Sequence, residues 1–197
     1  MNKLLLFAKK RDLHPGNVLL SYPYCYVRDL GLCISESGSS DIKEIMGVMP
    51  YVAPELFKDG AYSKASDVYS FGILMWEISS EKKPFHEFIH DQLLALRIFN
   101  GLRPTITEDT PQFYRDLMQK CWHSDPTQRP TAKEISELTD MWRYFPTQEI
   151  KDQLANVEEL RERHISTKKE TQIQHPGAIY TSRIMPNITA GEQMCLR

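Results

Sequence analysis

Three polar residues near the start of the chain have the types and spacing of a site that handles phosphate and magnesium. Asp12 is followed five positions later by Asn17, and Asp29 lies beyond a short apolar segment. Carboxylate and amide oxygens are ligands that Mg²⁺ prefers, and a further carboxylate can orient the hydroxyl that attacks a phosphate. The spacing therefore indicates phosphoryl-transfer chemistry.

A small hairpin would have to position these residues. The apolar run 18–20 and residues 26–29 predict two short strands joined through Ser21–Tyr24. Such a hairpin presents Asn17 and Asp29 from neighbouring ends. Taken singly, however, each of the three polar residues is more often a helix cap or a turn residue, so the rest of the chain has to decide.

Motifs of one large family follow in order along the sequence. They are Ala53-Pro54-Glu55, then 67–72 (Asp-Val-Tyr-Ser-Phe-Gly), then Cys121-Trp122, then 125–130 (Asp-Pro-Thr-Gln-Arg-Pro). Over about residues 1–142 the chain resembles the C-terminal lobe of the protein-kinase catalytic domain. Chance agreement of the whole series is negligible. The pattern over 47–55 looks most like the tyrosine-kinase-like group, whose members mostly phosphorylate serine or threonine.

The resemblance assigns roles to the first three residues. Asp12 matches the catalytic-loop aspartate that orients the substrate hydroxyl, and Asn17, five positions later in the same loop, is the second candidate catalytic residue. Asn17 and Asp29 match the magnesium ligands, so ATP and Mg²⁺ are the implied cofactors. Leu19 would form the floor beneath the adenine ring, although it is equally an ordinary core residue of a strand.

Other matched residues have structural or regulatory roles in the family. Glu55 and Arg129 match a buried ion pair that holds the activation segment on the lobe. Asp67 resembles the residue whose carboxylate binds the catalytic-loop backbone. Arg11 precedes the catalytic aspartate, as in kinases that pair this arginine with a phosphorylated loop. Polar residues over 35–44 predict that loop, with the candidate phosphate acceptors Ser35, Ser37, Ser39 and Ser40.

The sequence departs from the family pattern at several positions. Lys10 replaces a histidine that normally packs in an apolar environment, and a lysine ammonium is costly to bury without a partner. Leu30 replaces the commoner phenylalanine of Asp-Phe-Gly. Val48 replaces a threonine that normally bonds to the catalytic aspartate, and His14 lies where serine/threonine kinases carry a lysine. Specificity for serine and threonine or for tyrosine is therefore left open.

The phosphate-binding half of the family pattern is not found in this sequence. A kinase covers its nucleotide with a glycine-rich loop and holds it with a strand lysine. None of the nine glycines forms G-x-G-x-x-G, and only ten residues precede Arg11. We therefore expect a fragment that lacks the N-terminal lobe and is inactive by itself.

Periodicity predicts a mainly α body. Apolar residues recur at helical spacing over 64–79, which is apolar nearly all round and therefore buried, and further helices are predicted over 91–99, 112–122 and 131–142. The last of these begins with the capping box Thr131-x-x-Glu134. The predicted organisation is a kinase C-lobe over 1–145, an amphipathic tail helix over 146–164, and a disordered tail over 165–197.

Composition sets further bounds. The chain has 197 residues, 41% of them apolar, and a formal charge of −2, which gives no argument for a nucleic-acid or membrane partner. The four cysteines form no zinc-type spacing, so reduced thiols and a cytoplasmic location are expected. The apolar stretch near the N-terminus is too short for a signal peptide or a membrane span.

These observations support two functional interpretations. In the first, the chain is a protein-kinase fragment whose complete form transfers the ATP γ-phosphate to a protein hydroxyl, with serine or threonine as the expected acceptor. In the second, it is a catalytically inactive kinase-like lobe that binds another protein, such as a second kinase or a regulator.

Overall fold

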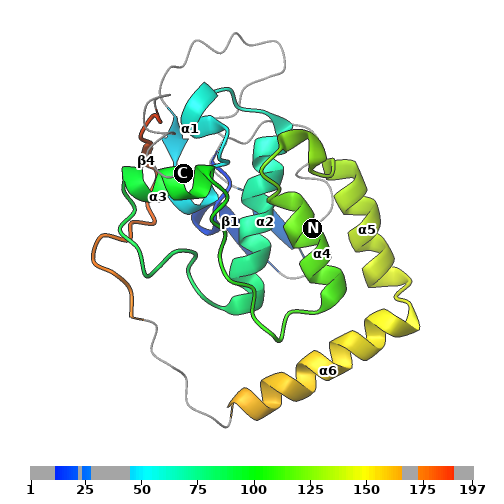
Figure 1. The fold of residues 1–197 in the computed structure, drawn as a ribbon. Coiled ribbons are helices and arrows are strands. Elements are labelled where there is room, and N and C mark those ends of the chain that lie inside the picture. Colours follow the sequence, from blue (N-terminus) through cyan, green and yellow to red (C-terminus); the bar gives the residue numbers. More distant parts are fainter. Residues whose placement is uncertain (1–11, 22–23, 28–44, 166–172, 189–197) are drawn as a thin grey trace.

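Helix α2 (Lys64–Ser80) runs through the centre of the molecule (Figure 1). It begins with a capping box in which the Ser66 backbone N–H donates to Ser63 Oγ over 3.1 Å, and the Ser63 N–H donates to Ser66 Oγ over 3.0 Å. Twelve of its 17 residues are buried, because apolar side chains occur on all of its sides. The predicted central buried helix is thus confirmed.

The computed structural model describes residues 12–21, 24–27, 45–165 and 173–188. Five further α-helices in these ranges are α1 (Leu56–Asp59), α3 (Gln92–Phe99), α4 (Gln112–Cys121), α5 (Ala132–Tyr144) and α6 (Gln148–Ile165). The strands of the described residues are β1 (Val18–Ser21), β2 (Tyr24–Val27), β3 (Met46–Gly47) and β4 (Arg183–Ile184). The fold is mainly α with a short hairpin, as the sequence predicts.

Helix α4 packs directly against α2 at a glycine. A Cβ atom added to Gly72 would lie 2.9 Å from Cys121 Cβ and 3.2 Å from the Met118 carbonyl oxygen. The absence of a side chain at Gly72 therefore allows the two helices to approach closely. The neighbouring helix α5 begins with the predicted capping box, since the Glu134 N–H donates to Thr131 Oγ1 over 3.2 Å.

The hairpin differs from its predicted boundaries. β1 and β2 are antiparallel, with Val18 opposite Val27 and Ser21 opposite Tyr24. The second strand thus begins two residues before the predicted 26–29 and ends at Val27, and Asp29 lies outside the described residues. Only two residues connect the strands, which is the commonest hairpin length and makes a longer connection unnecessary.

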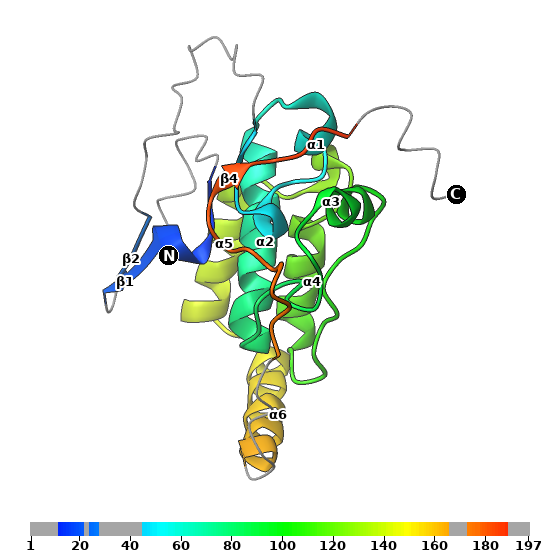
Figure 2. The same ribbon diagram turned by 90° about the vertical axis from the view of Figure 1, so that its left-hand side faces the viewer.

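Helix α6 begins two residues later and ends one residue later than the tail helix predicted over 146–164, and it extends away from the rest of the lobe (Figure 2). Its contacts with the lobe include the Arg161 guanidinium, which donates to the Ser79 carbonyl over 3.3 Å and lies 3.6 Å from the Asp109 carboxylate. Leu154, an apolar residue of this helix, is 48% exposed. In the described part of the chain, no helix combines the length and the apolarity needed to cross a membrane.

The prediction of a disordered tail is wrong for residues 173–188. Strand β4 pairs antiparallel with β3, and Ala178, Met185 and Ile188 are buried. The segment follows the surface of the lobe as an extended chain, so the positions of its apolar residues depend on where that surface has apolar contacts. For this reason its sequence shows no periodicity. The remaining tail residues, 166–172 and 189–197, lie outside the described residues.

Candidate catalytic site

The segment from Asp12 to Asn17 forms a tight turn that brings its two ends together. Pro15–Asn17 is one turn of 3₁₀ helix, and the Asn17 backbone N–H donates to the His14 carbonyl over 2.9 Å. The Asn17 side-chain amide then donates to the backbone carbonyl of Asp12, also over 2.9 Å. This bond fixes the separation of the two residues, so the five-residue spacing seen in the sequence corresponds to a direct contact.

The Asp12 carboxylate lies against the segment that precedes helix α1. A Cβ atom added to Gly47 would lie 3.6 Å from Asp12 Oδ1 and 2.9 Å from Val52 Cγ2, so the backbone at Gly47 passes directly beside the carboxylate. His14 Nε2 lies 3.6 Å from Asp12 Oδ2. The side chain of Asp12 is only 9% exposed, which restricts the carboxylate to a small open face.

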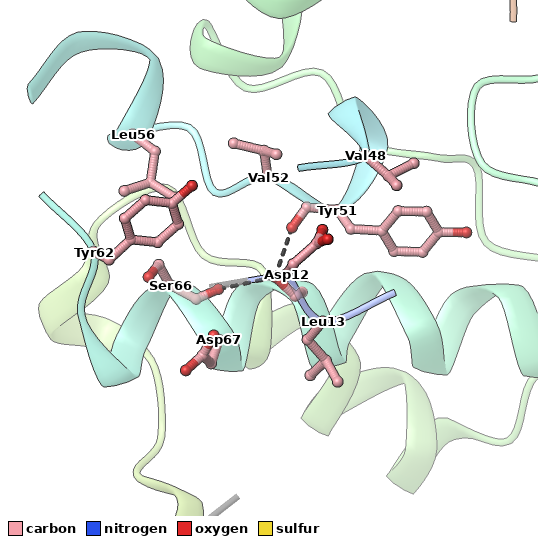
Figure 3. Close-up of a pocket in the computed structure, with 10 residues that line it drawn as sticks. Asp12, Leu13, Val48, Tyr51, Val52, Leu56, Tyr62, Ser66 and Asp67 are labelled. Carbon is pink, nitrogen blue, oxygen red and sulfur yellow. Dashed lines mark hydrogen bonds between the residues drawn. The ribbon is translucent and has the colours of Figure 1, made fainter. Parts of the chain in front are cut away.

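A small pocket surrounds Asp12 (Figure 3). Val48 and Tyr51 line it from the segment before α1, whereas Ser66 and Asp67 line it from the first turn of α2. Val48 is 1% exposed and has no hydroxyl, so it cannot donate the hydrogen bond that a threonine would supply at this position. The predicted contact of Asp67 with the catalytic-loop backbone stays a prediction, although Asp67 is buried beside Asp12.

Tyr51 belongs to a polar cluster that sequence reasoning missed. Its hydroxyl donates to the Glu77 carboxylate of α2, and Lys83 Nζ lies 2.6 Å from Glu77 Oε1. Burial, together with the Glu77 carboxylate, raises the pKa of Tyr51 well above its usual range, so the phenol stays protonated and remains a donor. The cluster ties the segment before α1 to the far end of α2.

Ser70 fixes the backbone of the same segment. The buried Ser70 hydroxyl donates to the Tyr51 carbonyl over 2.6 Å and lies 3.2 Å from the Ser66 carbonyl. A mid-helix serine that bonds to a distant carbonyl satisfies a buried acceptor that no regular element would serve. Its position within the motif over 67–72 was the only sequence signal for this role.

The predicted ion pair between Glu55 and Arg129 is present. The Arg129 side chain is completely buried, whereas the Glu55 side chain is 18% exposed. The guanidinium also donates to the carbonyls of Ala65 and His123 over 2.9 and 2.8 Å. The guanidinium therefore connects the end of the segment that borders Asp12 to the start of α2 and to the turn after α4.

Of the three residues predicted to contact the nucleotide or its magnesium, the structure describes Asn17 and Leu19. Asn17 is 6% exposed, and its amide nitrogen is committed to Asp12, which leaves the amide oxygen as the atom able to bind a cation. Leu19 on β1 is 45% exposed and thus available to an apolar ligand surface. Asp29 lies outside the described residues, and within those residues no group of three or more His, Cys, Asp or Glu could hold a metal ion.

Comparisons with known proteins place this geometry in context. A family model described as protein tyrosine and serine/threonine kinase matches residues 9–138. Mitogen-activated protein kinase kinase kinase 7 of Homo sapiens is 36% identical over 143 residues, which are 69% of this chain and 23% of that protein. A LIM domain-containing serine/threonine-protein kinase of Dictyostelium discoideum is 37% identical over 128 residues, 64% of this chain and 20% of that protein.

A further relative has a name that does not mention a kinase. Cyclic GMP-binding protein C of Dictyostelium discoideum is 35% identical over 137 residues, which cover 65% of this chain and 5% of that protein. The chain thus spans less than a quarter of the length of these three relatives. The family match over residues 9–138 includes Asp12 and most of the helical body.

Proposed function

Because the chain belongs to the protein tyrosine and serine/threonine kinase family, we propose that it supplies the acceptor-side half of an ATP-dependent protein kinase. The observation that carries the proposal is the bond from the Asn17 amide to the Asp12 carbonyl, since it holds the two catalytic-loop residues at one site. We assign residues 1–145 to the kinase C-lobe and 146–164 to a tail helix.

Asp12 would orient the hydroxyl of the acceptor protein and accept its proton as the oxygen attacks the terminal phosphate. Its carboxylate is suited to this role because it is nearly enclosed, with its neighbours Gly47 and His14 fixed beside it. Orientation of this kind supplies a large part of the barrier reduction in phosphoryl transfer, where the protein forms no covalent bond itself.

Asn17 and Asp29 are the residues that we assign to hold an Mg²⁺–ATP complex. The Asn17 amide oxygen is the hard ligand that Mg²⁺ prefers, and we assign Asp29 as the second protein ligand. Bound Mg²⁺ would offset the charge that develops on the phosphate oxygens. Leu19 offers an exposed apolar surface to the adenine ring.

The acceptor would be a protein serine or threonine, a proposal supported by the relatives whose names specify a kinase of that specificity. Membership of the family implies a protein substrate. A cytoplasmic location, in which the chain would act in signalling, fits the free thiol of Cys121. Burial raises the pKa of this thiol to about 12, so it is poorly reactive.

Phosphotransfer tests the proposal directly. The chain is joined in one polypeptide to the glycine-rich lobe of a relative, such as mitogen-activated protein kinase kinase kinase 7, and incubated with labelled ATP and a generic protein acceptor. We expect incorporation of label that Asp12→Asn lowers by at least about a thousandfold, because the acceptor hydroxyl loses its orienting carboxylate.

Glu158→Ala is the control, since Glu158 is exposed on α6, far along the chain from the site. It should leave the rate unchanged. A rate that Asp12→Asn does not alter would reject the catalytic assignment. An inactive fusion whose circular dichroism shows a folded lobe would favour the noncatalytic binding lobe instead.

A further inference from the structure

The tail segment 173–188 adds a strand beside the catalytic aspartate. In the β3–β4 pair, Gly47 lies opposite Arg183 and Met46 lies opposite Ile184. The Met185 N–H donates to the Ile45 carbonyl over 2.7 Å, continuing the pairing past the end of the strand. Figure 2 shows β4 beside the segment that leads from β3 to α1.

Both ends of the segment are held on the lobe by further hydrogen bonds. Towards the C-terminus, the Ile188 N–H donates to the Phe57 carbonyl of α1 over 2.8 Å. Towards the N-terminus, the Tyr180 hydroxyl donates to the Pro84 carbonyl over 2.9 Å, and the His90 N–H donates to the Gly177 carbonyl over 2.9 Å. The segment therefore follows one defined path across the lobe.

Buried and exposed residues are both found along this path. Met185 and Ile188 are 5% and 3% exposed and join the main apolar core, whereas Ile184 is 57% exposed. Gly177 packs closely on the lobe, because an added Cβ would lie 3.0 Å from Ile89 Cγ2. These features give the contact a fixed register as well as apolar area.

The occupied edge lies next to the candidate site. Gly47 passes beside the Asp12 carboxylate, so an acceptor chain that lay along β3 would bring its hydroxyl close to Asp12. An extended chain binds such an edge by main-chain hydrogen bonds, and pockets for alternate side chains provide selectivity. The tail already makes both kinds of contact, through the Met185 N–H and the buried Met185 side chain.

We propose that residues 176–188 are a built-in competitor of the acceptor protein, which hold the β3 edge until an extended acceptor segment displaces them. This inference rests on the proposed kinase function for the identity of the displacing partner. The docking itself does not depend on catalysis. Because the tail is tethered, it competes at an effective concentration in the millimolar range, which weakens the binding of a free segment without blocking it.

Binding of a free copy of the tail tests the docking. A fluorescein-labelled peptide with the sequence of residues 176–188 is titrated with the unchanged chain and with Met185→Asp, and anisotropy is measured. Met185→Asp places a charge in a buried position and should release the tail, so the peptide should bind this variant about tenfold more tightly. The adjacent Ile184→Asp is the matched control, because the Ile184 side chain is exposed to solvent. The peptide should bind the Ile184→Asp variant with the same affinity as the unchanged chain.

Hydrogen exchange on the unchanged chain is a second test that does not depend on whether the Met185→Asp variant folds. Excess unlabelled peptide added to the unchanged chain should accelerate exchange of the chain's own Met185 and Ile188 amides, since these lose their carbonyl partners on displacement. Peptide affinity that is equal for Met185→Asp and Ile184→Asp, absence of peptide binding, or unchanged exchange at saturating peptide would each overturn the displaceable tail.

The acceptor part of the inference has its own readout. In the fused, active protein, Met185→Asp should lower the KM for an acceptor peptide about tenfold and leave the KM for ATP unchanged. An unchanged acceptor KM would show that the tail does not compete with acceptors. A fused protein without any phosphotransfer would refute the proposed function, and the anisotropy result would still decide whether the tail is displaceable.

Discussion

Arg129 and Glu55, 74 positions apart in the chain, are joined by two hydrogen bonds of 2.7 Å, from Nη1 to Oε1 and from Nη2 to Oε2. This paired geometry is the strongest that a guanidinium and a carboxylate form. It secures the last residue of the segment that carries Gly47 and Tyr51 beside Asp12. The position of the candidate site therefore depends on an ion pair far from it in sequence.

Glu55→Ala and Arg129→Ala should each lower the free energy of unfolding by about 3–5 kcal/mol, because removal of one partner leaves the other charge largely buried without its counter-charge. Urea unfolding followed by circular dichroism measures the change. Glu137→Ala is the matched control, since it breaks an exposed pair with Lys133 at 3.7 Å and should leave the midpoint nearly unchanged. Equal midpoints for all variants would contradict the structural role of the pair.

Asn17→Ala in the fused protein should lower kcat about a hundredfold, because Asp12 loses the bond that positions it. It should also raise the Mg²⁺ concentration needed for half-maximal rate. Asn17→Asp keeps an oxygen ligand but loses the N–H donor. This variant should therefore keep a nearly normal Mg²⁺ concentration for half-maximal rate, while its kcat falls. Initial rates over a magnesium titration separate these effects, with the exposed Ser21→Ala as the control. An unaltered magnesium midpoint in Asn17→Ala would exclude Asn17 as a ligand.

Gly72→Ala should destabilise the lobe by about 1–3 kcal/mol, since the new methyl group would meet Cys121 Cβ and the backbone of α4. A gain in helix propensity would otherwise make this substitution favourable. The midpoint of urea unfolding decides the sign. Ile78→Ala, at a position that is 64% exposed on the same helix, serves for comparison and should have the smaller effect. A stabilised Gly72→Ala would show that α2 and α4 can separate without cost.

Acid should loosen the tail through His90. Burial lowers the pKa of His90 below its ordinary 6.5, and Arg183 lowers it further, while the backbone carbonyls bonded to the ring and the Asp91 carboxylate oppose the shift. The Tyr180 ring and the imidazole pack nearly perpendicular to each other, with 4.9 Å between their centroids. The unfolded state therefore binds a proton at His90 more readily than the folded state does. The contribution of neutral His90 to the free energy of unfolding is complete above pH 6.5 and is lost as the pH falls through the folded-state pKa.

Unfolding midpoints measured from pH 8 to pH 5 give the readout for this titration. His90→Gln should flatten the part of the decline that His90 causes, because glutamine does not titrate. The exposed His123→Gln should retain the full decline. A pH profile that is the same for His90→Gln and the unchanged chain would rule out His90 as the source.

The sequence allowed prediction of those features whose cause is local or whose residue types are highly specific. The spacing of Asp12 and Asn17 produces a turn short enough to close with one side-chain bond, and the apolar content of 64–79 requires a buried helix. The ion-pair partners Glu55 and Arg129 were predictable from motif resemblance alone, since nothing in their spacing indicates contact. Asp29 and the loop serines lie outside the described residues, so their roles stay predictions.

Only the tertiary structure decided what lies beside Asp12. The pairing of β3 with β4 joins residues such as Gly47 and Arg183, which are far apart in sequence, and an extended segment carries no period that could announce its partner. Met185 and Ile188 become buried only because the lobe provides a matching surface. The sequence by itself determined the turn that joins Asp12 to Asn17 and the helical body, because local spacing and hydrophobic periodicity encode both. The covering of the β3 edge was decided by long-range packing, which local patterns do not encode.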